Sequence, residues 1–338
     1  MGKRMKRINK LCLFLAAFLC LSGCGRAGMP GSGGIDPADG SAGGQEGKLK
    51  IVATIFPPYD FARQIAGGEA QVVMLLKPGM ESHAYEPTPA DIVEIMNSDI
   101  FLYAGGESDA WVRELLEGSD GHTKACALLD WVDPLMEETT QGMRVREENS
   151  GEETADGGVH LEAGEYDEHV WTSPKNAILL VQEICQVMSE CDPAHAQEYQ
   201  ENAAGYQKRL EQLDRDMREA ADAARKRPLV FGDRFPLLYF MKTYGLEYYA
   251  AFPGCSEETE PDAAMVAFLT DKVRTEQIPV VYYMDLSDGR IAKAIAEASG
   301  AKTAVFYSGH SITAEDLKAG EDYISLMYRN VETLRAFP

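Results

Sequence analysis

Short apolar runs alternate with amphipathic stretches along the chain from residue 48 onward, and this alternation occurs twice. Runs rich in β-branched and aromatic residues predict strands. They occupy residues 50–55, 72–76, 100–104 and 125–129, and then 229–231, 248–252, 280–284 and 303–307. Helical periodicity is found at residues 59–66, 89–97, 111–116, 174–188, 235–244, 261–276, 290–298 and 323–334. Apolar strands alternating with helices are typical of parallel sheets covered on both faces, so we predict two α/β lobes, each with roughly four strands.

A much longer helix is predicted between the lobes, over residues 192–227. Asp192 is placed to cap it, Pro193 suits its first turn and Pro228 ends it. About 34 residues at 1.5 Å each give roughly 50 Å, enough to run the height of both lobes. Its apolar positions recur every three or four residues, as in a coiled-coil dimer. Because this stripe is mostly Ala and Tyr, we favour a helix packed lengthwise against its own lobes.

The N-terminal residues have the pattern of a targeting segment rather than of a folded domain. Five basic residues precede an apolar stretch, Leu11–Leu21, of signal-peptide length. Leu21-Ser22-Gly23-Cys24 resembles the lipobox of bacterial lipoproteins, which implies cleavage after residue 23 and a lipid on Cys24; the alternative is an ordinary cleavage site. Residues 25–47 contain nine glycines, so residues 24–47 are predicted to be a flexible tether. We expect an extracytoplasmic protein anchored to the cell membrane, with lobes at residues 48–191 and 228–338.

Net charge and cysteine content exclude few classes of binding partner. The formal net charge is −22, and it becomes −27 without the five basic residues of the leader. This charge argues against nucleic acid and anionic membrane surfaces and is compatible with attraction of cations, although acidic surfaces also serve solubility alone. The lobes contain four cysteines without Cys-x-x-Cys spacing, namely Cys126, Cys185, Cys191 and Cys255. Their pairing cannot be read from sequence, and we favour buried free thiols over a disulfide.

Three histidines occupy positions from which one metal site could be built. His83 follows the predicted strand at residues 72–76, His310 follows the last predicted strand, and His169 precedes the helix opened by Pro174. Ligands of open parallel sheets bind at the carboxyl ends of strands, so two facing lobes would bring these side chains into one cleft. Neutral imidazole is the commonest zinc ligand, which makes this cleft the predicted metal site. Two other histidines, His122 and His195, have the pattern of surface residues.

Five motifs make residues 50–337 similar to the metal-binding lipoproteins of ABC importers, the zinc and manganese solute-binding proteins with a rigid connecting helix. The motifs are Gly79-Met80-Glu81-Ser82-His83-Ala84-Tyr85-Glu86-Pro87, Asp167-Glu168-His169-Val170-Trp171 with Ser173-Pro174, Tyr239-Phe240 with Tyr244-Gly245-Leu246, Glu260-Pro261, and Tyr323-Ile324-Ser325-Leu326-Met327 with Asn330. The resemblance implies capture of a transition-metal ion outside the cell and its delivery to a membrane permease with its ATPase. It implies a binding protein rather than an enzyme, and we expect a monomer.

The resemblance also assigns metal ligands. His83 and His169 match the first two ligands of the family. The third is usually a His or Glu five residues before the Tyr-Phe pair, but here Arg234 stands in that position, and arginine cannot bind a cation. The fourth position, usually an Asp, corresponds to His310. Asp233 is either a further ligand or the ion-pair partner of Arg234, and the sequence leaves both interpretations open.

Ligand type then indicates the cargo. Imidazole-rich sites suit Zn²⁺, whereas two carboxylates favour Mn²⁺, so we expect zinc with manganese or iron as the alternative. Glu86 is expected to orient His83 rather than to bind metal. Residues 137–168 contain eleven acidic residues and His160, similar to the acidic loop that zinc members insert; weak concentration of cations and a solvated insertion without a role both stay open.

Two other classes of protein are compatible with parts of the sequence. A zinc hydrolase would need an open coordination position beside a general base, but the chain has no His-Glu-x-x-His helix and no nucleophile elbow. A surface adhesin would need only the lipid anchor. This alternative would be favoured if the protein did not retain any metal.

Overall fold

The computed structural model describes residues 47–80, 85–118, 121–141, 166–254 and 263–338, which all belong to a compact unit that begins at Gln45. The predicted signal peptide and residues 24–46 of the predicted tether lie outside the described residues. So do Cys24, His83, His160, Cys255 and the Glu260-Pro261 motif. Within the described ranges, no helix combines the length and the apolar character needed to cross a membrane.

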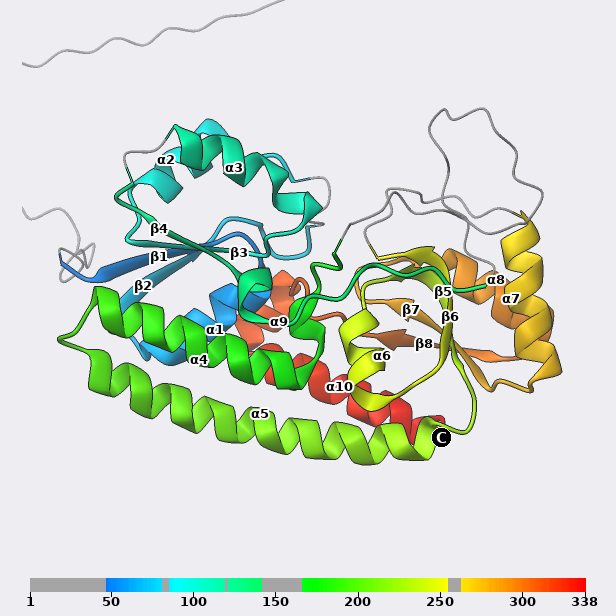
Figure 1. Cartoon of the computed structure of the whole chain (residues 1–338). Coiled ribbons are helices and arrows are strands. Elements are labelled where there is room, and N and C mark those ends of the chain that lie inside the picture. Colours follow the sequence, from blue (N-terminus) through cyan, green and yellow to red (C-terminus); the bar gives the residue numbers. More distant parts are fainter. Residues whose placement is uncertain (1–46, 81–84, 119–120, 142–165, 255–262) are drawn as a thin grey trace, which may run out of the picture. The chain divides into compact units, whose positions relative to one another are not determined.

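The N-terminal lobe is a parallel sheet with helices on both faces. Its strands are β1 (Leu49–Ala53), β2 (Ala70–Met74), β3 (Ile100–Tyr103) and β4 (Lys124–Ala127), in the order β2-β1-β3-β4. Helices α1 (Phe56–Ala66) and α4 (Pro174–Cys191) cover one face, and α2 (Pro89–Met96) and α3 (Ala110–Glu117) cover the other (Figure 1). Because both faces are covered, the central strands can be continuous apolar runs.

The C-terminal lobe repeats this arrangement. Its strands are β5 (Leu229–Phe235), β6 (Tyr248–Pro253), β7 (Val280–Met284) and β8 (Lys302–Phe306), all parallel and in the order β6-β5-β7-β8. Its helices are α6 (Leu238–Tyr244), α7 (Ala263–Thr275), α8 (Arg290–Ser299), α9 (Ala314–Ala319) and α10 (Tyr323–Ala336). Helices α7 and α8 cover one face of this sheet. The predicted fold class and all eight predicted strands are therefore confirmed.

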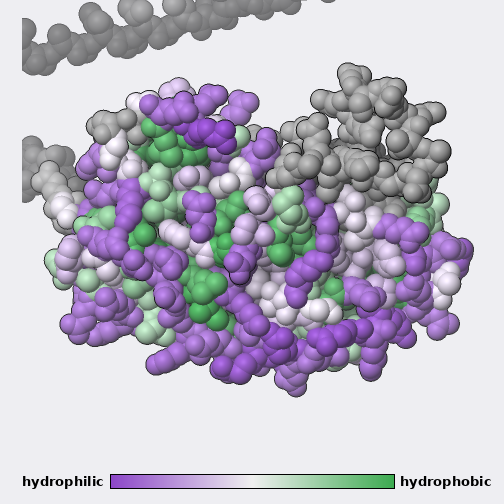
Figure 2. Space-filling view, viewed as in Figure 1, coloured by the Kyte–Doolittle hydropathy of each residue, from purple (hydrophilic) through white to green (hydrophobic). Residues whose placement is uncertain are grey.

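A single long helix, α5 (Ala196–Ala224), packs against α1, α4 and α10 and so contacts elements of both lobes (Figure 1). Its apolar stripe is buried within this chain, including Tyr206, Leu210, Leu213 and Met217. Figure 2 shows hydrophilic residues along the lower edge of the molecule, where Figure 1 places α5. The stripe therefore faces the chain's own lobes, which confirms our choice of a packed helix over a coiled-coil seam.

One apolar core extends through both lobes. It includes Ile51 of β1, Leu180 of α4, Leu213 of α5, Phe231 of β5 and Met327 of α10, all of them buried. Burial of apolar surface is the main favourable term in folding. The same core packs against both sheets. The loops at the carboxyl ends of their strands are therefore anchored to one core.

The predicted start of the long helix was wrong. The helix begins at Ala196 with His195 as its N-cap. Asp192 follows α4, and its carboxylate accepts hydrogen bonds from His195 Nδ1 at 2.7 Å and the Tyr199 hydroxyl at 2.8 Å. This carboxylate therefore binds two side chains rather than the first N–H groups of α5.

Helix α9 and one cysteine also differ from the predictions. Helix α9 was missed, although its N-cap Thr313 accepts a hydrogen bond from the main-chain N–H of Asp316, a spacing typical of helix starts. Cys126, Cys185 and Cys191 are free thiols, as predicted. Cys185 is buried and Cys126 half-buried, but Cys191 is exposed, so the prediction of buried thiols is wrong for that residue.

Candidate metal centre

His169 lies at the start of a single helical turn, Val170–Thr172, that leads into α4. Its side chain is fully buried. The Asp167 carboxylate accepts two hydrogen bonds through Oδ1, from the His169 main-chain N–H at 2.7 Å and from its Nδ1 at 2.9 Å. A carboxylate can only accept, so the proton is on Nδ1 and the lone pair of the neutral ring is on Nε2. This is the tautomer that a metal-binding histidine needs.

The charges around His169 also favour a cation. Burial of the ring disfavours its protonated form, but the carboxylates of Asp167, Glu168 and Glu137 outweigh burial and raise the pKa of His169. The same negative field would stabilise a bound metal ion. The acidic residues nearest the site therefore have a local electrostatic role, whatever the rest of the acidic segment does.

The segment before His169 is fastened to the C-terminal lobe. The Tyr239 hydroxyl donates to the main-chain oxygen of Asp167 at 2.8 Å and accepts from the Leu135 N–H at 3.0 Å. Tyr239 belongs to α6. This one hydroxyl therefore joins α6 to Leu135, just before the acidic segment of residues 137–168, and to Asp167, near the end of that segment.

His310 is positioned by the loop that follows β8. Gly309 has φ +66°, a left-handed conformation that favours glycine and turns the chain just before the histidine. The Asp285 carboxylate, at the end of β7, accepts from the Ser308 N–H at 2.8 Å and the Ser308 hydroxyl at 3.0 Å. The Ser308 hydroxyl oxygen in turn accepts from the His310 N–H at 3.2 Å. Two strand ends thus hold this loop.

The structure brings His169 and His310 together. Their ring centroids are 5.8 Å apart, and the Trp171 ring makes edge contacts with both, at 5.5 Å and 5.4 Å. The Trp171 indole N–H donates to the main-chain oxygen of Ser308 at 3.1 Å. The tryptophan therefore fixes the separation of the two histidines and excludes water from one side of them.

His83 lies outside the described residues, but both flanks of its segment are described. The Gly79 N–H donates to the Ser311 hydroxyl at 3.3 Å, next to His310. On the other flank, Tyr85 and His310 line the same small cavity. Glu86, the expected orienting residue, is exposed.

Asp233 and Arg234 lie at the carboxyl end of β5. The Asp233 Oδ1 accepts from the Arg234 main-chain N–H at 2.9 Å, and Oδ2 accepts from the Met284 N–H at 3.2 Å. Both oxygens therefore brace the ends of β5 and β7, a role that the sequence did not indicate. Asp233 still borders a cavity of about 290 Å³ that His169, Arg234 and His310 also line.

A second, much smaller cavity contains two buried carboxyl groups. Asp109 accepts from the Ala104 and Gly105 main-chain N–H groups at 2.7 and 3.2 Å, and burial raises its pKa to about 7. The Glu168 carboxylate accepts hydrogen bonds from the Ser108 main-chain N–H at 3.1 Å and from the Ser108 hydroxyl. Glu168 belongs by sequence to the predicted acidic loop, but its side chain is buried in the structure. A role for it could have been inferred from its place beside a candidate ligand.

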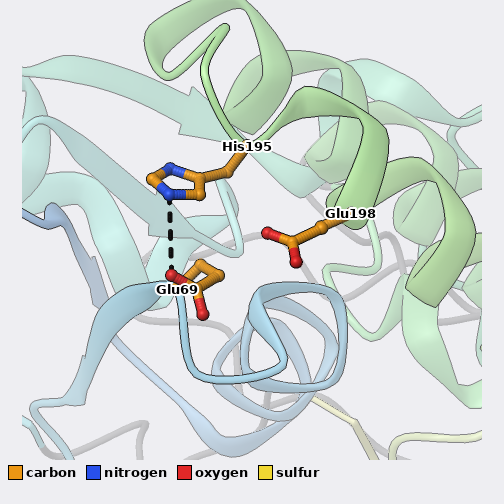
Figure 3. A group of neighbouring side chains, drawn as sticks. All are labelled: Glu69, His195 and Glu198. Carbon is orange, nitrogen blue, oxygen red and sulfur yellow. Dashed lines mark ion pairs between the residues drawn. The ribbon is translucent and has the colours of Figure 1, made fainter.

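Another group with metal-binding atoms lies away from these cavities. Glu69, His195 and Glu198 place one ligand atom each within 4.8 Å of one another, the only such group of three among the described residues (Figure 3). His195 Nε2 is 3.5 Å from Glu69. His195 and Glu69 are more than a third exposed, and Glu198 lies in the first turn of α5, where acidic residues are common. Ion pairing at a helix end accounts for this group.

The chain is similar in sequence to known zinc-binding proteins. The chain is 34% identical over 290 residues to the zinc-binding lipoprotein AdcA of Streptococcus pneumoniae, an alignment that covers 86% of the chain and 56% of that relative. It thus spans little more than half the length of that protein. It is 29% identical to the high-affinity zinc uptake system protein ZnuA of Bacillus subtilis, over 98% of the chain and 97% of the relative.

A solved structure shows the same fold. The Zn(II)-bound ZnuA-like domain of Streptococcus pneumoniae AdcA superimposes with a TM-score of 0.68 at 32% identity, over 86% of this chain and 99% of that domain. The family described as zinc-uptake complex component A, periplasmic, matches residues 51–337. This match covers both lobes and the helix between them, and the chain therefore belongs to the ZnuA family.

Proposed function

We propose that the chain is the extracytoplasmic solute-binding component of an ABC importer, which captures Zn²⁺ and delivers it to a permease powered by an ATPase. The observation that carries this proposal is the approach of His169 and His310, from opposite lobes, to a centroid separation of 5.8 Å. Two buried imidazoles beside a negative field form the kind of site that suits zinc. The names of the relatives, which are zinc-binding and zinc-uptake proteins, support zinc over manganese.

We propose His83 as the third ligand. The support comes from its flanks, because Gly79 bonds to Ser311 and Tyr85 shares a cavity with His310. Asp233 is the weaker candidate for a fourth ligand, because each of its oxygens already accepts one main-chain hydrogen bond, although each keeps a lone pair. A water molecule or an external donor can complete tetrahedral coordination instead.

The protein is proposed to act as a monomer held at the membrane through a lipid on Cys24, without a catalytic step. The sequence supports the anchor through its lipobox-like segment. A long helix packed against both lobes argues for limited hinge motion, so release of zinc is proposed to require local rearrangement of the site loops.

The test is zinc affinity of the chelator-stripped chain beside a His310→Ala variant. Tight binding that falls by at least about a hundredfold in the variant supports the site. The matched control is His122→Ala, because His122 is an exposed histidine on the N-terminal lobe. Tight zinc binding that is equal in all three proteins would show that His310 is not a zinc ligand. A chain that binds manganese but not zinc would refute the proposed cargo.

A further inference from the structure

The cavity beside the two histidines is much larger than a metal ion requires. Its volume is about 290 Å³, whereas one water molecule occupies about 30 Å³ in the liquid. Pockets that bind organic molecules begin at about 300 Å³. His169 and His310 line this cavity together with the ends of β5 and β7. Its volume is therefore at the lower limit for a site that binds a small organic molecule, and the proposed metal ligands are part of its lining.

The walls of the cavity have the chemistry of a site for a small carboxylate. Two arginines, Arg234 and Arg290, are among the residues that line it. Guanidinium groups recognise carboxylates through paired hydrogen bonds. Phe252, Met284 and Ile291 supply apolar surface. Two arginines beside an apolar wall can bind the carboxylate and the carbon skeleton of an organic anion.

Three aspartates, Asp233, Asp285 and Asp288, line the same cavity, and each accepts at least one main-chain hydrogen bond. Asp233 accepts hydrogen bonds from the main-chain N–H groups of Arg234 and Met284. Asp285 accepts from the N–H and the hydroxyl of Ser308. Asp233 and Asp285 stiffen the strand ends that form the cavity, and the charge of all three acids is already partly offset by hydrogen-bond donors.

Leu286 supplies an independent observation. It lines the cavity, its side chain is 45% exposed, and its φ is +69°. A bulky side chain rarely adopts this left-handed conformation. Strained backbone of this kind persists mainly at ligand clamps and other functional sites. An exposed leucine held this way beside the cavity is suited to cover the carbon skeleton of a bound molecule.

We propose that the cavity binds a small organic zinc chelator with a carboxylate group, so that the ion is captured together with its chelator. This inference rests on the proposed zinc-binding function. His169 and His310 bind the ion, Arg234 binds the carboxylate, and Leu286 covers the apolar part. The chelator's own donor atoms complete the coordination that the chain, with an arginine at the third family position, does not supply.

The experiment measures zinc occupancy of the full chain at constant free zinc, set by a metal buffer, while L-histidine or citrate is added. A chelator that only competes for zinc leaves occupancy unchanged under these conditions, whereas one that enters the site raises it. We expect the apparent zinc affinity to rise at least about tenfold with one of the two chelators. The chelator that acts identifies an amino acid or a hydroxycarboxylate as the preferred class.

Two variants test the location of the chelator. Leu286→Gly relaxes the backbone, because glycine tolerates positive φ, and it removes the covering side chain. Arg234→Gln removes the guanidinium. Both should bring the ratio of affinities with and without chelator close to one. The matched control is Leu179→Ala, since Leu179 is an equally exposed leucine on α4, outside the residues that line the cavity.

The outcomes separate this inference from the proposed function. If the chain binds zinc tightly and neither chelator raises occupancy, the inference is wrong and the proposed function stands. If the chelator effect survives in both cavity variants, or is lost equally in Leu179→Ala, the assignment to this cavity is wrong. If zinc is bound neither alone nor with a chelator, both the inference and the proposed function are wrong.

Discussion

The Asp167 carboxylate and the His169 ring form a hydrogen bond of 2.9 Å between Oδ1 and Nδ1, with both side chains buried. This bond fixes the ring orientation and leaves Nε2 as the atom that can bind metal. Asp167 is itself held from the C-terminal lobe, because the Tyr239 hydroxyl donates to its main-chain oxygen. The proposed ligand is thus oriented by a carboxylate that another element keeps in place.

Replacing Asp167 should therefore weaken zinc binding without direct loss of a ligand. Asp167→Asn keeps the shape but removes the charge, and partners of this kind typically contribute 10–100-fold in metal affinity. We expect a loss of about that size in a competition titration at constant pH. The control is Asp133→Asn, an exposed aspartate on the same lobe, which should leave affinity unchanged. Equal affinity in both variants would show that Asp167 does not orient the ligand.

Gly106 tests the packing behind the site. A Cβ at this position would lie 2.2 Å from Glu168 Oε2 and 2.4 Å from Glu168 Cβ. Gly106→Ala must displace this buried side chain, which directly precedes His169, and overpacking of this kind costs about 1–3 kcal/mol. We expect the free energy of unfolding to fall by that amount in urea denaturation.

The matched glycine is Gly205, in the middle of α5, where an added Cβ meets nothing within 4 Å. Gly205→Ala should raise the free energy of unfolding by about 0.5–1 kcal/mol, because alanine is the better helix former. If both alanine variants changed the free energy of unfolding in the same direction, the prediction that Gly106→Ala destabilises the protein by overpacking against Glu168 would be wrong.

The sequence predicted the fold well because the central strands of the two sheets, such as β1 and β7, are largely buried. Val280–Met284 was predicted with the bounds that β7 has in the structure. The start of α5 was mispredicted because Asp192 looks like a helix cap, while its carboxylate in fact binds His195 and Tyr199. Local spacing cannot distinguish a carboxylate that caps a helix from one that binds neighbouring side chains.

Only those features of the site that depend on the order of elements along the chain could be predicted from the sequence. The sequence places His83 and His310 after predicted strands and His169 before a predicted helix, which indicated a common cleft for all three. The structure brings the rings of His169 and His310 together, whereas His83 lies outside the described residues. The roles of Tyr239 and Trp171 depend on hydrogen bonds between segments far apart in sequence, which no local pattern encodes. The cavity beside the histidines likewise depends on the packing of loops from separate strands.

Asp60 should contribute strongly to stability. It is fully buried on α1 and accepts hydrogen bonds from Arg63 at 2.6 Å, the Tyr206 hydroxyl at 3.1 Å and the Tyr323 N–H at 3.0 Å. It thereby joins α1 to α5 and α10. Asp60→Ala leaves buried donors without their acceptor, so we expect the free energy of unfolding to fall by about 3 kcal/mol.

An exposed aspartate provides the comparison for Asp60. Asp222 pairs with Arg225 at 2.8 Å, with both side chains about half exposed. Asp222→Ala should change the free energy of unfolding by less than about 0.5 kcal/mol. A loss of that small size in Asp60→Ala as well would mean that the buried contacts do not brace the three helices.

His195 should make stability depend on pH. Its hydrogen bond to Asp192 at 2.7 Å, together with Glu69, raises the pKa of His195 above its ordinary value. The folded state therefore favours the protonated ring. This contribution is complete below about pH 6.5, the ordinary value for histidine, and is lost as pH rises through the higher pKa of the folded state.

The measurement compares thermal unfolding of wild type and His195→Gln at about pH 5.5 and about pH 8.5, below and above the ordinary histidine value. Because the protonated ring stabilises the folded state, the wild type should exceed the variant in Tm by more at the lower pH. Asp192→Asn removes the main cause of the shift, so an NMR titration should show a lower midpoint for His195 in that variant. A Tm difference that is the same at both pH values, with an unchanged midpoint in Asp192→Asn, would show that the ion pair at the start of α5 contributes nothing to folding.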